Sequence, residues 1–295
     1  MTAFGLDWLA LREPFDRAAR EAAAPSLDLP ALASRLRGDH SMLPVLDLAC
    51  GTGANLRELA PRLGGFQRWL LVDHDPLLLD ALPGVFARWT HERGFSLQSA
   101  GSGLRVDGPD WSAEIQLRHI DLAQALDTVP FAEARLVTAS ALLDLVSVAW
   151  LDALIGYVHS VGAAALFALS VDGRVAWEPH VEGDEAVHRL FTLHQRRDKG
   201  FGSAMGADAV RLAAERLAAA GYEVVQADSD WRIDGSSSAE AAAMLTAMVD
   251  GMAGAALEQA PAAEALVNGW KVRRTGSTAR ARLSVGHCEL LAIPR

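Results

Sequence analysis

The nine residues from Val45 to Gly53 constrain this chain more than any other stretch. They read VLDLACGTG, a continuous apolar run that contains one acid, Asp47, and ends in a Gly-Thr-Gly turn. The pattern predicts a buried strand entering a tight turn, because Gly51 and Gly53 can adopt positive φ and carry no Cβ. The amphipathic segment that follows, Asn55 to Ala60, predicts a helix whose first N–H groups point back at the turn. We therefore expect a ligand at this turn.

A strand, a glycine turn and a helix also occur in dinucleotide-binding folds, whose fingerprint is GxGxxG or GxGxxA. Leu56 stands at the third fingerprint position, which disfavours that fold. The string VLDLACGTG instead resembles motif I of the class I S-adenosylmethionine-dependent methyltransferases. A second apolar run, Trp69 to Asp73, ends in an acid at the distance that one βαβ unit requires. The resemblance implies an α/β fold, a Rossmann-like seven-stranded methyltransferase sheet with an antiparallel last strand and helices on both faces.

The resemblance also implies S-adenosylmethionine as the cofactor. Gly51 and Gly53 would approach its methionine part, and Asp47 would help hold its amino group. Asp73 would accept from the ribose hydroxyls, and Asp121 from the adenine amino group. The full set of predicted cofactor-binding residues is Asp47, Ala49, Cys50, Gly51, Gly53, Asp73, His74, Asp121, Leu122 and Ser140.

Composition limits the other classes of function. With 295 residues of which 51% are hydrophobic, the chain can bury a large core, and we expect a single methyltransferase domain over 1–295. The formal net charge of −10 points away from a general nucleic-acid binder, since such proteins neutralise phosphates. Cys50 and Cys288 are expected as small buried residues rather than a disulfide, and no spacing of metal ligands occurs.

Targeting signals are not evident in the sequence. Residues 1–8 have neither the basic start nor the apolar core of a signal peptide. The longest apolar tract, Ala139 to Val171, is interrupted by two aspartates and a histidine and predicts strand, helix and strand rather than a membrane span. We expect a cytoplasmic protein without membrane association, and the sequence leaves a homodimer open.

The N-terminal segment, 1–40, is expected to form a helical lid. Apolar positions recur at helical spacing from Phe4 to Ala24, and Pro14 is expected to separate two short helices. In the resembled family such helices cover the cofactor and the acceptor, so Trp8, Arg12 and Arg20 are candidate lid residues, the first two for binding the acceptor. A solvated face with one core tryptophan is the alternative.

Two insertions, 178–206 and 236–270, interrupt the core pattern and are expected to line or cover the acceptor site. The first contains the most individual stretch, His194 to Gly202. There Arg196 and Lys199 are available to an anionic group and Phe201 is a further candidate for binding the acceptor. His194 is a candidate catalytic residue that can move a proton near neutral pH. A solvated charged loop is the alternative.

Asp144 is the second candidate catalytic residue. It follows the predicted fourth core strand, Ala134 to Ser140, whose end faces the transferred methyl in the resembled family. Asp144 orients the acceptor, acts as a base, or caps the next helix, and the sequence leaves these alternatives open. Enzymes that methylate amino groups of nucleobases or protein glutamine place an Asn- or Asp-Pro-Pro-aromatic motif here. This chain has the residues Ser140 to Leu143 instead, which disfavours those reactions.

The sequence thus predicts methyl transfer to a small-molecule acceptor. This acceptor would carry a carboxylate or phosphate that Arg196 and Lys199 can bind. A dedicated base is unnecessary if the acceptor is already ionised, because positioning alone contributes about 7–11 kcal/mol in favourable cases. Two alternatives stay open. One is an RNA methyltransferase that uses two basic clusters, and the other is an inactive cofactor-binding partner or regulatory subunit. The first cluster is Arg196, Arg197 and Lys199, and the second is Lys271, Arg273, Arg274, Arg280 and Arg282.

Overall fold

The computed structural model describes residues 5–101 and 103–295, so Phe4, expected at the start of the first helix, lies outside the described residues. The strands are β1 (Met42–Leu48), β2 (Gly65–Asp73), β3 (Ser96–Ala100), β4 (Gly103–Asp107), β5 (Trp111–His119), β6 (Leu136–Ser140), β7 (Ala164–Glu178), β8 (Tyr222–Asp228), β9 (Trp231–Asp234) and β10 (Arg282–Pro294). The α-helices are α1 (Leu6–Ala23), α2 (Leu29–Arg37), α3 (Ala54–Leu63), α4 (Pro76–Arg93), α5 (Val148–Ser160), α6 (Asp184–Gln195), α7 (Ala209–Ala219), α8 (Ala239–Gln259) and α9 (Glu264–Thr275).

One mixed sheet carries all these strands, in the order β3-β4-β5-β2-β1-β6-β7-β10-β8, with β9 paired to β10. The strands β5, β2, β1, β6 and β7 are parallel neighbours, and β10 runs antiparallel between β7 and β8. This confirms the expected seven-stranded order with an antiparallel last strand. In the part of the chain that the structure describes, the sheet has ten strands, because β3 and β4 extend one edge and β9 extends β8. Strand β3 was not expected, since most of its side chains are exposed and its sequence carries no apolar pattern.

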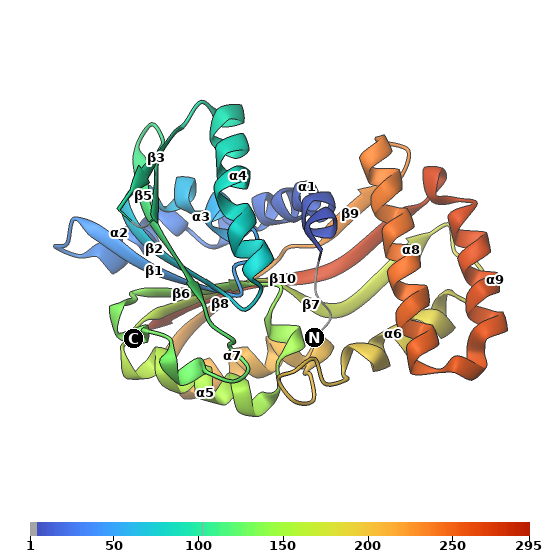
Figure 1. Cartoon of the computed structure of the whole chain (residues 1–295). Coiled ribbons are helices and arrows are strands. Elements are labelled where there is room, and N and C mark those ends of the chain that lie inside the picture. The colour runs from blue at the N-terminus through green and yellow to red at the C-terminus, as the bar shows by residue number, and fades with distance from the viewer. Residues whose placement is uncertain (1–4, 102) are drawn as a thin grey trace.

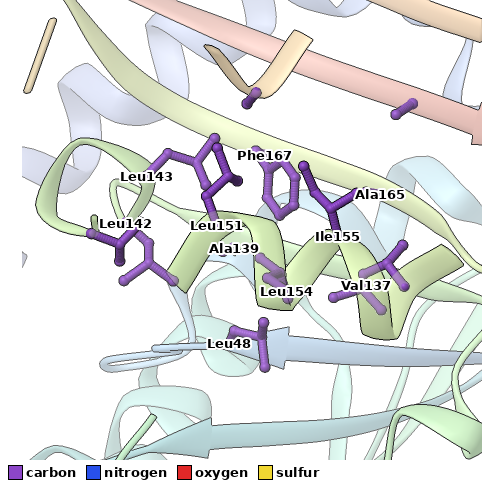
Figure 2. Close-up of a cluster of buried hydrophobic side chains, with 14 of the residues drawn as sticks. Leu48, Val137, Ala139, Leu142, Leu143, Leu151, Leu154, Ile155, Ala165 and Phe167 are labelled. Carbon is purple, nitrogen blue, oxygen red and sulfur yellow. The ribbon is translucent and has the colours of Figure 1, made fainter. Parts of the chain in front are cut away.

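Helices cover both faces of the sheet (Figure 1). α2, α3 and α4 pack on one face and α5 and α7 on the other, each through its own buried apolar cluster. Figure 2 shows part of the cluster beneath α5 and α7, in which leucines of α5 and of the preceding turn meet the side chains of three central strands. Its labelled members are Leu48, Val137, Ala139, Leu142, Leu143, Leu151, Leu154, Ile155, Ala165 and Phe167. The central strands β1 and β6 and the first half of β7 are therefore buried on both sides, which explains their continuous apolar sequence.

The first helix differs from the expectation. α1 is one helix from Leu6 to Ala23, with Pro14 inside it rather than between two helices. A proline removes one backbone hydrogen bond and disfavours the preceding turn. Here Leu11, Phe15 and Ala19 pack against the cluster around Trp231, and this packing holds the helix together across the proline.

The fifth core strand also runs further than expected. The sequence predicts a turn at Asp172-Gly173-Arg174, but β7 continues through it to Glu178. Gly173 has φ +86°, and the pairing register with β10 shifts between Val285 and His287. The three residues are therefore a bulge in a long strand, and β7 projects beyond the edge at which the other parallel strands end.

This projection carries the two insertions. The first insertion contains α6 and the second contains α8 and α9, and the three helices pack on each other around Val187, Val249 and Trp270. Figure 1 shows them at one end of the sheet, beside β9 and the projecting halves of β7 and β10. α8 is long and apolar enough to cross a membrane by length and composition, and 39% of its most apolar window is buried within the protein. The expected cytoplasmic location stays a prediction.

Candidate functional site

The glycine turn lies where the chain reverses its direction across the sheet. The chain runs outward from β1 to β2 and β5, and then returns to β6 on the other side of β1. The carboxyl ends of β1 and β6 therefore flank a topological switch point, where ligands bind in open α/β sheets. Ala49, Gly51 and Gly53 all have positive φ, of 53°, 54° and 74°. The turn thus has the sharp backbone that the sequence predicts.

The two glycines serve different purposes. A Cβ on Gly53 would lie 2.8 Å from Leu82 and 2.9 Å from Phe86, so that glycine allows α4 to pack on the turn. A Cβ on Gly51 would meet only Leu9 of α1, at 3.6 Å, an ordinary contact. Gly51 is therefore required by its backbone conformation rather than by space. The contact with Leu9 places the predicted lid helix directly over the turn.

Asp73 and Asp75 take different positions at the end of β2. Asp73 is 4% exposed, and its carboxylate accepts from the N–H of Gly51 at 2.7 Å and from the N–H of Asp75 at 2.9 Å. Asp75 is the N-cap of α4 and accepts from Leu77 N–H. Each oxygen of Asp73 keeps a lone pair after these bonds, which ribose hydroxyls can use. The geometry favours Asp73 over Asp75, the other acid after β2, as the carboxylate that would accept from the ribose hydroxyls. His74 lies beside it, with Nδ1 3.4 Å from Asp73 Oδ1.

Asp47 is fully buried beneath the turn. Its Oδ1 accepts from Asn55 Nδ2 at 2.7 Å, and its Oδ2 has no hydrogen-bond partner among the described residues. Burial raises the pKa of Asp47 to about 7. A buried oxygen without a partner is costly unless a ligand supplies a donor. The amino group of S-adenosylmethionine is such a donor, so the site fits the cofactor that the sequence implies.

The remaining predicted cofactor residues lie around the same edge. Asp121 directly follows Ile120, whose N–H donates to the Asp73 carbonyl, and Asp121 itself accepts from Ala123 N–H. The side chain of Leu122 is buried in the core, so contact with an adenine would be made by its backbone. Cys50 is buried and unoxidised, and burial raises the pKa of its thiol. Cys288 is likewise a buried free thiol.

Asp144 lies in a short turn after β6, and it is 9% exposed. Its Oδ1 has no hydrogen-bond partner among the described residues. Ser147, not Asp144, caps α5, because its hydroxyl accepts from Trp150 N–H. This excludes helix capping as the role of Asp144. Burial raises the pKa of Asp144 to about 6, and the charge of Arg12 opposes that rise.

The two α1 residues predicted to bind the methyl acceptor, Trp8 and Arg12, lie against β9. The guanidinium of Arg12 lies 5.1 Å from the centre of the Trp231 ring and binds Asp16, which accepts from Trp231 Nε1 at 2.9 Å. Trp8 meets the same ring edge to face at 6.5 Å. His287 lies 4.8 Å from the ring on the β10 side. Burial lowers the pKa of His287 to about 4, so its imidazole is neutral.

The first insertion forms a separate group. His194 Nε2 is 2.9 Å from Glu258 Oε2, and its Nδ1 is 3.5 Å from Lys199 Nζ. Arg196 is paired with Asp208 at 2.7 Å. The ring of Phe201 packs on Trp150, part of the core. Within the described ranges, no hydrogen bond or ion pair joins these residues to Asp144 or Arg12, and their roles stay predictions.

A cleft of about 320 Å³ lies between α1, α3 and the end of α4. Its lining includes Ser140 at the end of β6, Leu169 of β7, and Asn55 and Arg20 from the two helices. The cleft therefore reaches the strand edge that carries the glycine turn. Sequence reasoning missed Asn55, although it is the second residue of α3. The structure also adds Trp231, His287 and Glu289, and the last is detectable as a lone charge within an apolar strand.

Comparison with known proteins gives similarity of structure but not of sequence. No protein-family model matches the chain, and no curated protein does. A SAM-dependent methyltransferase from Geobacter sulfurreducens, solved with S-adenosyl-L-homocysteine, is 15% identical over 100% of both chains, with a TM-score of 0.43. One from Thiobacillus denitrificans, also solved with S-adenosyl-L-homocysteine, is 16% identical over 100% of both chains, with a TM-score of 0.43. A cyclopropane-fatty-acyl-phospholipid synthase-like protein from Lactobacillus casei is 11% identical over 98% of this chain and 94% of its own, with a TM-score of 0.48.

The order and direction of the strands decide the assignment of the fold. β10 enters antiparallel between β7 and β8, and the glycine turn follows the central strand β1. The fold is that of the class I methyltransferases. The roles of individual residues rest on the geometry described above.

Proposed function

We propose that this protein is an S-adenosylmethionine-dependent methyltransferase that acts on a small-molecule acceptor. The observation that carries the proposal is the buried Asp47 oxygen without a partner, directly beneath a glycine turn with Asp73 beside it. An apolar residue would fill the position of Asp47 at lower free energy if no ligand used the carboxylate.

S-adenosylmethionine supplies the reactive methyl group, and the protein supplies binding and alignment. Asp47 Oδ2 would accept from the amino group, and Asp73 from the ribose hydroxyls. Asp121 and the backbone of Leu122 would hold the adenine at the next strand end. Ser140, on the opposite side of β1, would border the space in which the methyl is transferred.

Asp144 is the candidate proton acceptor for the reaction. S-adenosylmethionine would give up its methyl group to the acceptor atom, and its sulfur would keep the electron pair of the bond that breaks. A proton carried by the acceptor atom would pass to Asp144, whose free oxygen and pKa of about 6 suit a base near neutral pH. Arg12, whose charge acts on Asp144, would then be a cation for a carboxylate or phosphate on the acceptor.

Ion pairing supports a small acceptor over RNA. An RNA-binding surface needs free cations to neutralise phosphates. Five of the eight cations in the two basic clusters are paired with acids instead, and one of the five, Arg274, is fully buried. These pairs are Arg196 with Asp208, Arg197 with Glu258, Lys271 with Asp250, Arg274 with Asp184 and Arg282 with Asp234. The predicted anion-binding role of Arg196 and Lys199 would require at least the first of these pairs to open.

Calorimetric titration with S-adenosylmethionine and S-adenosylhomocysteine tests the proposal. We expect wild-type protein to bind both, and Asp73→Ala to lose about 1–3 kcal/mol of binding free energy. Asp75→Ala is the matched control, because Asp75 caps α4 and is not assigned to the ribose. Methyl uptake from labelled cofactor by a panel of small acids, phosphates and amines would then identify the acceptor. A well-folded wild type that binds neither ligand would refute the proposal.

A further inference from the structure

Arg20 is an unusual residue for a surface helix. It lies in the last turn of α1, and its side chain is 5% exposed. Its Nε is 3.5 Å from Glu289 Oε2, and Glu289 is 1% exposed in the apolar strand β10. Burying such a pair contributes little net stability, because the loss of hydration offsets most of the attraction. A role other than stability should therefore account for it.

The contacts of Arg20 lead directly to the cofactor site. Its Nη1 donates to Asn55 Oδ1 at 2.8 Å. The amide nitrogen of Asn55 donates to Asp47 Oδ1 at 2.7 Å and to Thr138 Oγ1 at 3.0 Å. Thr138 donates in turn to the Leu166 carbonyl. Because an arginine can only donate, it fixes which end of the Asn55 amide faces Asp47.

The charges around Asp47 are unevenly placed. Asp73 on β2 raises the pKa of Asp47, whereas Arg20 on α1 lowers it. Among the described residues, the other titratable groups nearby are the thiol of Cys50 in the turn, Glu289 behind Arg20, and Glu58 of α3, whose charge acts on Glu289. Arg20 therefore favours the ionised carboxylate, the form that can bind an ammonium group.

We propose that Arg20 is a positioning residue that orients Asn55 and Asp47 for the amino group of the cofactor, so that cofactor affinity depends on the docking of α1. This rests on the proposed function, in which Asp47 binds that amino group. α1 also carries Trp8 and Arg12 at its other end. Because coupling free energies are reciprocal, a bound cofactor holds these residues in place for the acceptor.

The test uses three variants of the whole chain. Arg20→Met removes the cation and its hydrogen bonds, and Arg20→Met/Glu289→Leu also removes the acid left unpaired. Arg20→Lys keeps the charge alone. Arg135→Met is the control, because Arg135 is exposed and its guanidinium donates to the Leu36 carbonyl, on an α2 contact that lies off this network. Urea unfolding and calorimetric titration with S-adenosylhomocysteine, from pH 6 to 9, are measured for each.

We expect Arg20→Met to bind S-adenosylhomocysteine at least about tenfold more weakly at pH 7, a change of about 1.4 kcal/mol. The double variant should regain wild-type stability, since a hydrophobic pair replaces a buried ion pair at little cost. It should not regain affinity, and its affinity should reach its maximum at higher pH than in wild type. Arg20→Lys should restore the wild-type pH profile with reduced affinity.

The outcomes separate the two proposals. Wild-type affinity in the double variant would show that Arg20 is only structural and would overturn this inference, while leaving the proposed function intact. A wild type that binds no S-adenosylhomocysteine would refute the proposed function itself. An unchanged pH profile in Arg20→Met, when that variant is folded, would also contradict the inference.

Discussion

Asp47→Asn should make the protein more stable in alkaline solution and unable to hold the cofactor. The wild-type carboxyl is fully buried, and burial raises its pKa from 3.8 to about 7. The folded state thus binds a proton more tightly than the unfolded chain, so stability falls as pH rises from about 4 to 7. Asparagine has nearly the same shape and never ionises.

The magnitude follows from the two pKa values. Each unit of difference corresponds to about 1.4 kcal/mol, so the ionisable carboxyl reduces stability by about 1.7 kcal/mol at pH 5 and about 4 kcal/mol at pH 8. The amide that replaces Oδ2 has no acceptor, which costs about 1–3 kcal/mol at both pH values. The difference in stability between the variant and wild type should therefore shift in favour of the variant by about 2–3 kcal/mol from pH 5 to pH 8.

Urea unfolding without ligand at the two pH values measures this gain. Asp250→Asn is the control, since Asp250 is exposed and paired with Lys271, and its effect should be the same at both pH values. Titration with S-adenosylhomocysteine should show no binding to Asp47→Asn, because the new amide N–H₂ faces the ligand's ammonium. A stability difference from wild type that does not change with pH would refute the reasoning.

Three further outcomes are expected. Gly53→Ala should destabilise the fold by about 2–5 kcal/mol in urea unfolding, because the new side chain is strained at positive φ and overlaps with α4. Gly51→Ala should cost only about 1–2 kcal/mol, because only the positive φ is strained there. Equal losses of stability in the two variants would contradict the packing argument. Asp144→Asn should lower kcat about 100-fold once an acceptor is known, and should remove the rise in rate with pH that wild type shows around pH 6. Arg274→Met should lower the free energy of unfolding by about 3–5 kcal/mol, because it leaves Asp184 without the partner that holds the pKa of that carboxyl low. Wild-type stability of this variant in thermal unfolding would show that the ion pair is dispensable.

The architecture could be predicted because its signals are local in the chain. The apolar run before Gly51 and the acid that ends the run at Asp73 each depend on a few neighbouring residues. Buried parallel strands need continuous apolar sequence, and a sharp turn needs glycine. Two predictions were wrong because tertiary packing overrode the local pattern. Packing keeps Pro14 within one helix instead of between two, and strand pairing makes Asp172 to Arg174 a bulge instead of a turn.

The sequence by itself determined the sheet, the glycine turn and the acids at the strand ends, because each follows from the spacing of residues along one segment. Only the tertiary structure decided what surrounds them. It brought Arg20 and Glu289 together beneath the turn from opposite ends of the chain, and it left one oxygen of Asp144 without a partner. Burial and partnering depend on distances in space, so no local pattern encodes them.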